Sequence, residues 1–127
     1  MNVPIETSKA PKAIGPYSQA IMSSPFLYTS GQIGLDPATG ALVEGGIEAQ
    51  ATQVFHNLEA ILQAAQMSFQ DVVKTTIFLT DLDDFGCVNK IYERYFGPTF
   101  PARSTVQVCR LPREAVIEIE VVARQKI

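Results

Sequence analysis

The sequence predicts an α+β fold in which two helices cover one face of a β-sheet. Apolar residues recur at helical spacing in two segments, about 47–66 and 84–96. Three further segments, 71–80, 102–110 and 115–125, are β-branched or alternate as strands do. The order is therefore extended segments, helix, strand, helix and two strands, which corresponds to a layered α+β arrangement.

Residues 17–35 are expected to be extended. They read YSQAIM, a turn at SSP, and FLYTSGQIGL, which alternates in part and closes with glycines. The following DPATG (Asp36–Gly40) has the composition of a turn, because proline pre-sets φ and glycine permits a positive φ.

The first helix is predicted over Ile47–Gln66, where an apolar stripe has helical period. His56 is the single histidine of the chain, and at 100° per residue it lies about 160° from the centre of that stripe. We therefore expect His56 on the solvent-exposed side of the helix, with a catalytic role as the alternative.

The second helix is predicted over about Asp84–Phe96, after the strand DVVKTTIFLT and the capping candidates in DLDDF. Gly97 and Pro98 end it. Asn89 falls beside the apolar stripe of this helix, so its amide needs hydrogen-bond partners. It either ties down a loop or takes part in a ligand site.

The stretch FPARSTVQVCRLP opens the next strand with an arginine. Because side chains alternate along a strand, one face carries Arg103, Thr105, Gln107 and Cys109. The opposite face, Ala102, Ser104, Val106 and Val108, is expected to belong to the core.

In the last strand, Glu118 and Glu120 share a face, and each needs water or a cation nearby. If this strand pairs with the preceding one across the turn RLPRE, Arg103 lies close to them. One interpretation is an ion pair on a solvated sheet. The other is that Arg103 binds a substrate carboxylate through its planar fork while a glutamate handles a proton or a water.

The uncovered face of the sheet would carry both polar residues and the apolar Val116 and Val122. Two helices cannot cover both faces of the sheet, and a partly apolar open face favours association. We expect an oligomer with closed symmetry.

Composition excludes several functional classes. The 127 residues are expected to form one domain, 1–127, with a net charge of −3 and no Lys/Arg cluster that would support nucleic-acid binding. No signal pattern or membrane-spanning run is present, which favours a cytoplasmic protein that does not bind membranes. Two distant cysteines and one histidine argue against a disulfide framework or a metal site.

Two N-terminal motifs place polar groups beside glycine. IGPYSQA carries Tyr17 just after Gly-Pro, and TSGQI carries Ser30 before Gly31. Glycine at such a position often allows a ligand to approach backbone N–H groups closely. The alternative interpretation of Tyr17 is a half-buried aromatic residue with no part in a ligand site.

Six motifs, in order and over nearly the whole chain, resemble those of the YjgF/RidA family of reactive-intermediate deaminases. They are IGPYSQA, TSGQIGLDPATG, DVVKTTIFL, DFGCVNKIYERYF, FPARSTVQV and RLP…VIEIEVVA. The resemblance implies a chorismate-mutase-like fold, with a mixed six-stranded sheet backed by two helices. It also implies homotrimers of barrel-like form whose sheets face inward and whose ligand sites lie in the clefts between subunits.

By the same resemblance, the activity is hydrolysis of 2-imino acids (2-iminobutanoate and 2-iminopropanoate) to 2-oxo acids and ammonia, which protects pyridoxal-phosphate enzymes from damage. No metal or organic cofactor is implied. The carboxylate-binding arginine corresponds to Arg103 and the water-positioning glutamate to Glu118. The other matching substrate-binding positions are Tyr17, Ser30, Gly31 and Asn89.

One position departs from the family pattern: Thr105 stands where many members have cysteine. The expected chemistry needs no sulfur, so activity should survive, and Thr105 is expected to help align the substrate. Two other functions remain as alternatives. One is a non-catalytic module that binds small carboxylates or 2-oxo acids in the same clefts. The other is a ribonuclease or translation inhibitor, which the acidic composition argues against.

Overall fold

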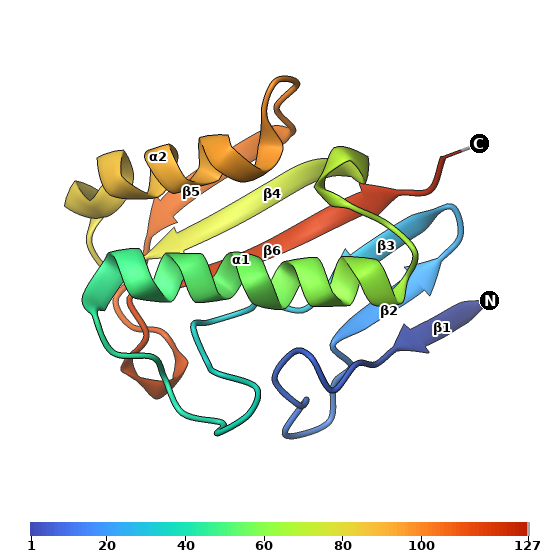
Figure 1. Ribbon diagram of the computed structural model, residues 1–127, viewed down its shortest axis with the longest axis horizontal. Helices are drawn as coiled ribbons and strands as arrows, with labels where there is room; N and C mark the ends of the chain where they lie inside the picture. Colours follow the sequence, from blue (N-terminus) through green and yellow to red (C-terminus); the bar gives the residue numbers. More distant parts are fainter. Residues whose placement is uncertain (127) are drawn as a thin grey trace.

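The computed structural model describes residues 1–126 and shows a six-stranded sheet with two helices packed on one face (Figure 1). The strands are β1 Asn2–Ile5, β2 Ala20–Ser23, β3 Phe26–Thr29, β4 Val72–Leu79, β5 Ala102–Gln107 and β6 Ile117–Arg124. The helices are α1 Gly46–Ala64 and α2 Phe85–Phe96. The strand order is β1-β2-β3-β6-β4-β5, antiparallel throughout except for the parallel pair β4–β5. The predicted α+β class, with a mixed sheet and two helices on one face, is confirmed.

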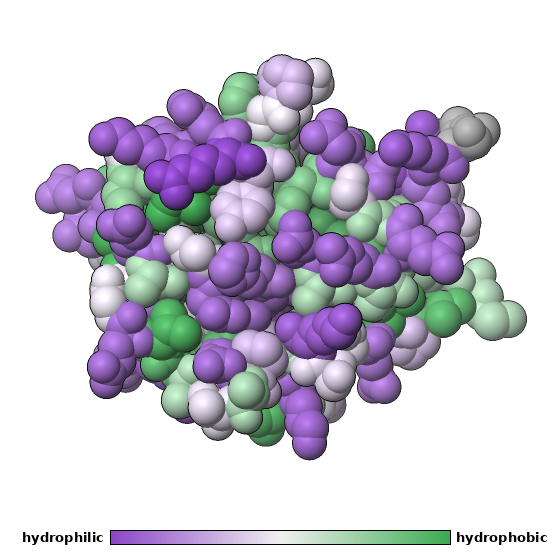
Figure 2. All heavy atoms as spheres, viewed as in Figure 1, coloured by the Kyte–Doolittle hydropathy of each residue, from purple (hydrophilic) through white to green (hydrophobic). Residues whose placement is uncertain are grey.

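Helix α1 forms where the apolar stripe predicted it. Val54, Phe55 and Leu58 on the stripe are fully buried, whereas His56 is exposed. The expectation of a surface histidine is confirmed. The helix layer turns a largely hydrophilic outer side to solvent (Figure 2). Among the helices of residues 1–126, none combines the length and apolar character that crossing a membrane requires.

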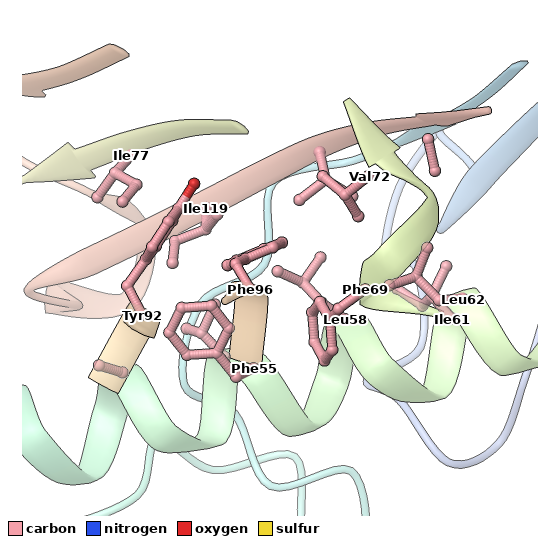
Figure 3. Close-up of a cluster of buried hydrophobic side chains, with 14 of the residues drawn as sticks. Phe55, Leu58, Ile61, Leu62, Phe69, Val72, Ile77, Tyr92, Phe96 and Ile119 are labelled. Atoms are coloured by element: carbon pink, nitrogen blue, oxygen red, sulfur yellow. The ribbon is translucent and has the colours of Figure 1, made fainter. Parts of the chain in front are cut away.

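An aromatic cluster joins α2 to α1 and to the sheet (Figure 3). The ring of Phe55 on α1 stacks on Tyr95 at 4.6 Å between centroids and meets Tyr92 and Phe96 edge-on. Phe69, in the 3-10 turn before β4, packs edge-on against Phe55. Because these rings pack edge-on or stacked against one another, the aromatic cluster fixes α2 against α1 and the sheet.

The order of the C-terminal strands differs from the prediction. β5 and β6 do not pair: β4 lies between them, parallel to β5 and antiparallel to β6. The physical reason is composition. The inward residues of β6, Ile117, Ile119 and Val121, are all buried and suit the middle of the sheet, whereas the short polar β5 suits an edge.

The two faces of β5 are also reversed relative to the prediction. Arg103 is in register with buried Thr75, so Arg103 and Thr105 lie on the helix-covered side of the sheet. Ala102, Ser104 and Val106, expected to be core, are exposed on the open side. The side chains on the open face of β5 therefore belong to the surface of the chain and not to its core.

The N-terminal half contains one strand that the sequence did not predict. β1 pairs with β2 at the far edge of the sheet, and β2 and β3 form a hairpin within the segment 17–35 that was expected to be extended.

The open face of the sheet carries Glu118 and Glu120, which are in register with Phe78 and Thr76 on β4. This face is uncovered in a single chain, as predicted.

Candidate active site

Arg103 lies in a cradle formed by α2. Its Nη1 donates a hydrogen bond of 2.9 Å to Oδ1 of Asn89. Its Cζ lies over the ring of Phe85, at 5.1 Å from the centroid, and over the ring of Tyr92, at 4.8 Å. A guanidinium within about 6 Å of an aromatic face is attracted by the ring quadrupole. The arginine is thus held by three neutral groups.

The helical period explains why these three groups converge. Phe85, Asn89 and Tyr92 are spaced i, i+4, i+7 and so lie on one face of α2. That face runs above β5, where Arg103 projects from the helix-covered side. Tyr92 is anchored in turn, because its hydroxyl is hydrogen-bonded to buried Thr75 on β4 at 2.8 Å.

Glu118 lies in a second site on the open face of the sheet. A pocket of about 300 Å³ there is lined in part by Tyr17, Gly31 and Glu118. Burial raises the pKa of Glu118 above its ordinary value, and the neighbouring Glu120 raises the pKa further. A carboxylate with a raised pKa, placed in a pocket, is a candidate for proton transfer.

Backbone hydrogen bonds fix the segment opposite Glu118. Gln32 and Ile119 exchange N–H···O bonds of 2.9 and 3.0 Å, which holds residues 30–32 beside β6. Gly31 therefore lies against the Glu118 side chain. The absence of a side chain at Gly31 allows another group to approach the backbone closely. Within one chain, that group is the side chain of Glu118.

Ser30 and Tyr17 are tied to the same loop. The Ser30 hydroxyl donates to the carbonyl of Ser18 at 2.5 Å, and its amide donates to the carbonyl of Gln19 at 2.9 Å. Ser30 thus stabilises the loop that carries Tyr17. The Tyr17 hydroxyl accepts a hydrogen bond from the amide of Ile14 at 3.3 Å, and its side chain is 53% exposed.

The structure divides the predicted site into two halves. Tyr17, Gly31 and Glu118 line one pocket, and Asn89 and Arg103 line another, together with Tyr92 and Phe100. Within one chain the side chains of Arg103 and Glu118 lie on opposite faces of the sheet. The expectation that Arg103 lies beside the glutamates of β6 in the same chain is wrong, because β4 intervenes and the alternation places them on different sides.

Thr105 belongs to the Arg103 half. Its hydroxyl oxygen is buried and has no hydrogen-bond partner among residues 1–126. Buried polar atoms are rarely left unpaired, so this hydroxyl, on the same face of β5 as Arg103, is an exception.

Sequence reasoning missed two contributors to the site. Phe85 and Tyr92 belong to the apolar stripe of α2 beside which Asn89 was expected, and both rings contact the Arg103 guanidinium. Their spacing around Asn89 was the available signal. Across residues 1–126, no group of three His, Cys, Asp or Glu side chains is arranged to hold a metal ion.

The fold and these two pockets define a small α+β protein that presents the Glu118 carboxylate on one face of the sheet and the Arg103 guanidinium on the other. The chain matches the family model described as Endoribonuclease L-PSP over residues 7–125. It belongs to that family, the YjgF/RidA family, as its motifs predicted.

Relatives with assigned names and solved structures agree with this assignment. The mouse protein named 2-iminobutanoate/2-iminopropanoate deaminase is 53% identical over 121 residues, which cover 95% of this chain and 90% of the mouse protein. A putative endoribonuclease from Thermotoga maritima is 52% identical, with a TM-score of 0.97 over 100% of both chains. TdcF from E. coli, solved with bound serine, is 42% identical with a TM-score of 0.93, over 98% of this chain and 99% of TdcF.

Proposed function

We propose that this protein hydrolyses 2-imino acids, such as 2-iminobutanoate and 2-iminopropanoate, to 2-oxo acids and ammonia, and so protects pyridoxal-phosphate enzymes from reactive imines. The observation that carries the proposal is that one chain presents both an Arg103 guanidinium without an ion-pair partner among residues 1–126 and a pocket carboxylate, Glu118, and is 53% identical to a named deaminase of this kind. The guanidinium suits the carboxylate that every such substrate carries.

The complete site would form between subunits. Arg103 and Glu118 lie on opposite faces of one sheet, so a single chain cannot bring both to one substrate. Arg103 is on the edge strand β5, where its half-site is accessible to the open face of a second copy. A homotrimer with sheets facing inward is the assembly that the family resemblance implies, and it would join the two halves at each interface.

In the mechanism, Arg103 binds the substrate carboxylate and so fixes the imine carbon over the pocket of the neighbouring copy. Glu118 orients a water and accepts its proton as the oxygen attacks the electrophilic carbon. Glu118 returns that proton to the imine nitrogen, which gives a tetrahedral carbinolamine, C(OH)(NH2). Glu118 then accepts the hydroxyl proton and delivers a proton to the amino nitrogen, so that the C–N bond breaks and ammonia leaves as the C=O bond forms.

The remaining residues of the site would assist this reaction. Asn89 holds Arg103, Thr105 offers its hydroxyl for alignment, and Tyr17 lines the pocket that holds Glu118. Positioning and general acid–base help of this kind supply several kcal/mol of barrier reduction, on the order of 10³-fold or more in rate.

A direct assay tests the chemistry. A pyridoxal-phosphate dehydratase generates 2-iminopropanoate from serine in situ, and pyruvate release is followed with and without the protein. Arg103→Ala should lose nearly all acceleration, whereas Arg110→Ala, an exposed arginine paired with Glu114, should keep it. Wild-type rates in Arg103→Ala would contradict the carboxylate clamp.

A mixing experiment tests the shared site. Arg103→Ala and Glu118→Gln subunits are each inactive under this mechanism. When equal amounts are unfolded and refolded together, about a quarter of the interfaces in a cyclic trimer combine an intact Arg103 with an intact Glu118. Recovery of about a quarter of the wild-type activity is expected. No recovery, with mixed trimers demonstrated by mass spectrometry, would contradict an intersubunit site.

Simple carboxylate binding is the second candidate, favoured by the bound serine in E. coli TdcF. Glu118→Gln separates the two functions, because it should abolish turnover while affinity for 2-oxobutanoate stays largely intact. If the wild type binds 2-oxobutanoate and never accelerates imine loss, the binding function is the correct one. RNA cleavage that survives the combined Arg103→Ala and Glu118→Gln substitutions would indicate a contaminant.

A further inference from the structure

The hydrogen-bond and ring partners of the Arg103 guanidinium are neutral, although the acidic Glu93 lines the same pocket. Within residues 1–126 the guanidinium makes no ion pair; its partners are the amide oxygen of Asn89 and the rings of Phe85 and Tyr92. An acidic partner would have held the arginine equally well, but it would have competed with an anionic ligand. The neutral cradle leaves the full positive charge available.

The cradle also restricts the orientation of the guanidinium. Arg103 has a long side chain with several rotatable bonds, and ordering it on ligand binding costs free energy. Contact with two ring faces and one hydrogen bond confines the planar group before the ligand arrives. A planar fork held in one orientation loses less entropy for each hydrogen bond it then forms.

The two rings differ in what fixes them. Tyr92 is 4% exposed, packs against Phe55 and Phe96, and is hydrogen-bonded to Thr75, so its position is set by the core. Phe85 is 37% exposed and lies outside the buried core. Its contact with Arg103 can therefore be altered without opening a cavity.

We propose that Phe85 and Tyr92 are positioning residues that hold the Arg103 guanidinium in the orientation that receives a substrate carboxylate. This inference rests on the proposed function, since it assumes that Arg103 binds the carboxylate of an imino acid. The partly exposed ring of Phe85 contacts the guanidinium from the solvent side. The ring of Tyr92 is fixed by its hydrogen bond to Thr75 on β4, and it therefore holds the guanidinium at a set position relative to the sheet.

Phe85→Leu tests the proposal because leucine keeps the apolar bulk and removes the π face. The contact corresponds to roughly 0.5–2 kcal/mol, so KM for the imine and the dissociation constant for 2-oxobutanoate should each rise about 2- to 30-fold. The kcat value and the melting temperature should stay near those of the wild type. Phe85→Tyr, which restores a π face, should recover wild-type KM.

Tyr92→Phe and Leu82→Ala provide matched comparisons. Tyr92→Phe keeps the ring and removes the hydrogen bond to Thr75, so we expect a smaller rise in KM than for Phe85→Leu. Leu82, an exposed apolar residue in the turn before α2, makes no contact of this kind with Arg103, and Leu82→Ala should leave KM unchanged.

A spectroscopic measurement separates this proposal from the proposed function. The Nε–H resonance of Arg103, assigned by its loss in Arg103→Lys, lies near two rings and should be shifted by their currents. Phe85→Leu should move it in the free protein, whether or not the protein is a deaminase.

The outcomes are distinguishable. If the wild type neither hydrolyses imines nor binds 2-oxobutanoate, the proposed function fails. If the wild type is active but Phe85→Leu changes neither KM nor the Nε–H resonance, the positioning role is wrong. A rise in KM without a change in that resonance would overturn the proposal as well, because the ring would then act by a route that bypasses Arg103.

Discussion

Gly31 lies directly against the carboxyl group of Glu118. A Cβ atom placed on Gly31 would lie 2.7 Å from Cδ and 2.9 Å from Cγ of Glu118, distances that real Cβ atoms essentially never show. The reciprocal backbone bonds between Gln32 and Ile119 hold the two segments at this separation. The position of the carboxylate in its pocket therefore depends on the absence of a side chain at residue 31.

Gly31→Ala should displace the Glu118 carboxyl group and lower kcat/KM by at least about 10-fold, because a misplaced general base loses much of its effect. Steady-state kinetics on in situ 2-iminopropanoate measure this. Gly86→Ala is the matched control, since a Cβ there meets nothing within 4 Å. On helix α2 that change should keep activity and add up to about 1 kcal/mol of stability. Full activity in Gly31→Ala would contradict the role given to Gly31.

Local patterns predicted the helices and central strands because burial of those segments follows from their own periodicity. The observed bounds agree to within two residues with the expected bounds for four elements, α1, α2, β4 and β6. β1 was missed because NVPI shows no alternation long enough to identify. Strand neighbours are set by non-local packing, which is why the sequence did not reveal that β4 separates β5 from β6.

The site residues were identifiable, but their arrangement was not. Alternation shows that Arg103 and Thr105 share a face of β5, and it does not show which face meets the helices. The small residues Ala102 and Ser104 resembled core and are exposed. Arg103 can lie on the helix-covered side because the rings of Phe85 and Tyr92 on α2 contact its guanidinium. These rings lie in a different segment of the sequence, so the pattern of β5 alone does not predict this contact.

The pH dependence of the reaction should report Glu118. Its pKa is raised above the ordinary value of 4.5 by burial and then by Glu120, and it must be deprotonated to accept a proton from water. The acid limb of kcat/KM should therefore fall at a pH above 4.5. Glu120→Gln removes the repulsion between the two carboxylates and should move this limb to lower pH. A limb that stays in place in Glu120→Gln would show that another group controls it.

The same shift predicts a stability effect with a defined sign. Because the pKa of Glu118 is higher in the folded state, the folded state binds the proton more tightly, and this stabilisation is present below the ordinary glutamate pKa and lost as pH rises through the folded-state pKa. Glu118→Gln should thus be more stable than wild type at neutral pH. The difference in chemical denaturation midpoints should shrink as pH falls toward 4. A difference that does not depend on pH would contradict the assignment.

Asn89→Asp tests the importance of a neutral cradle with almost no change in shape. The new carboxylate would lie about 2.9 Å from Nη1 of Arg103 and would pair with it. We expect KM to rise at least about 10-fold, since the substrate must then displace an internal anion. Thermal stability should be unchanged or higher.

Asn89→Ala serves as the comparison for that variant, because it removes the hydrogen bond to Arg103 and adds no charge. Its KM should rise less, by about 2- to 10-fold, which corresponds to the roughly 0.5–1.5 kcal/mol that a typical hydrogen bond contributes net. If Asn89→Ala and Asn89→Asp weaken the binding of 2-oxobutanoate equally, the loss of the bond and not the added charge explains the effect, and neutrality of the cradle is irrelevant.

Thr105→Val examines the unpaired hydroxyl of β5. A buried hydroxyl without a partner costs about 1–3 kcal/mol, and valine has nearly the same shape without that cost. Without ligand, Thr105→Val should therefore melt at a higher temperature than the wild type. If the hydroxyl bonds the substrate, as we propose, the same variant should bind 2-oxobutanoate about 2- to 10-fold more weakly.

The combination of higher intrinsic stability and weaker binding is specific to a polar atom that is paired only in the complex. Thr105→Ser, which keeps the hydroxyl, should retain wild-type affinity. A lower melting temperature for unliganded Thr105→Val would show instead that a neighbouring subunit already bonds this oxygen, because removing a paired group leaves its partner unsatisfied. Thermal melts with and without saturating 2-oxobutanoate, run on all three proteins, decide between these two partners for the hydroxyl.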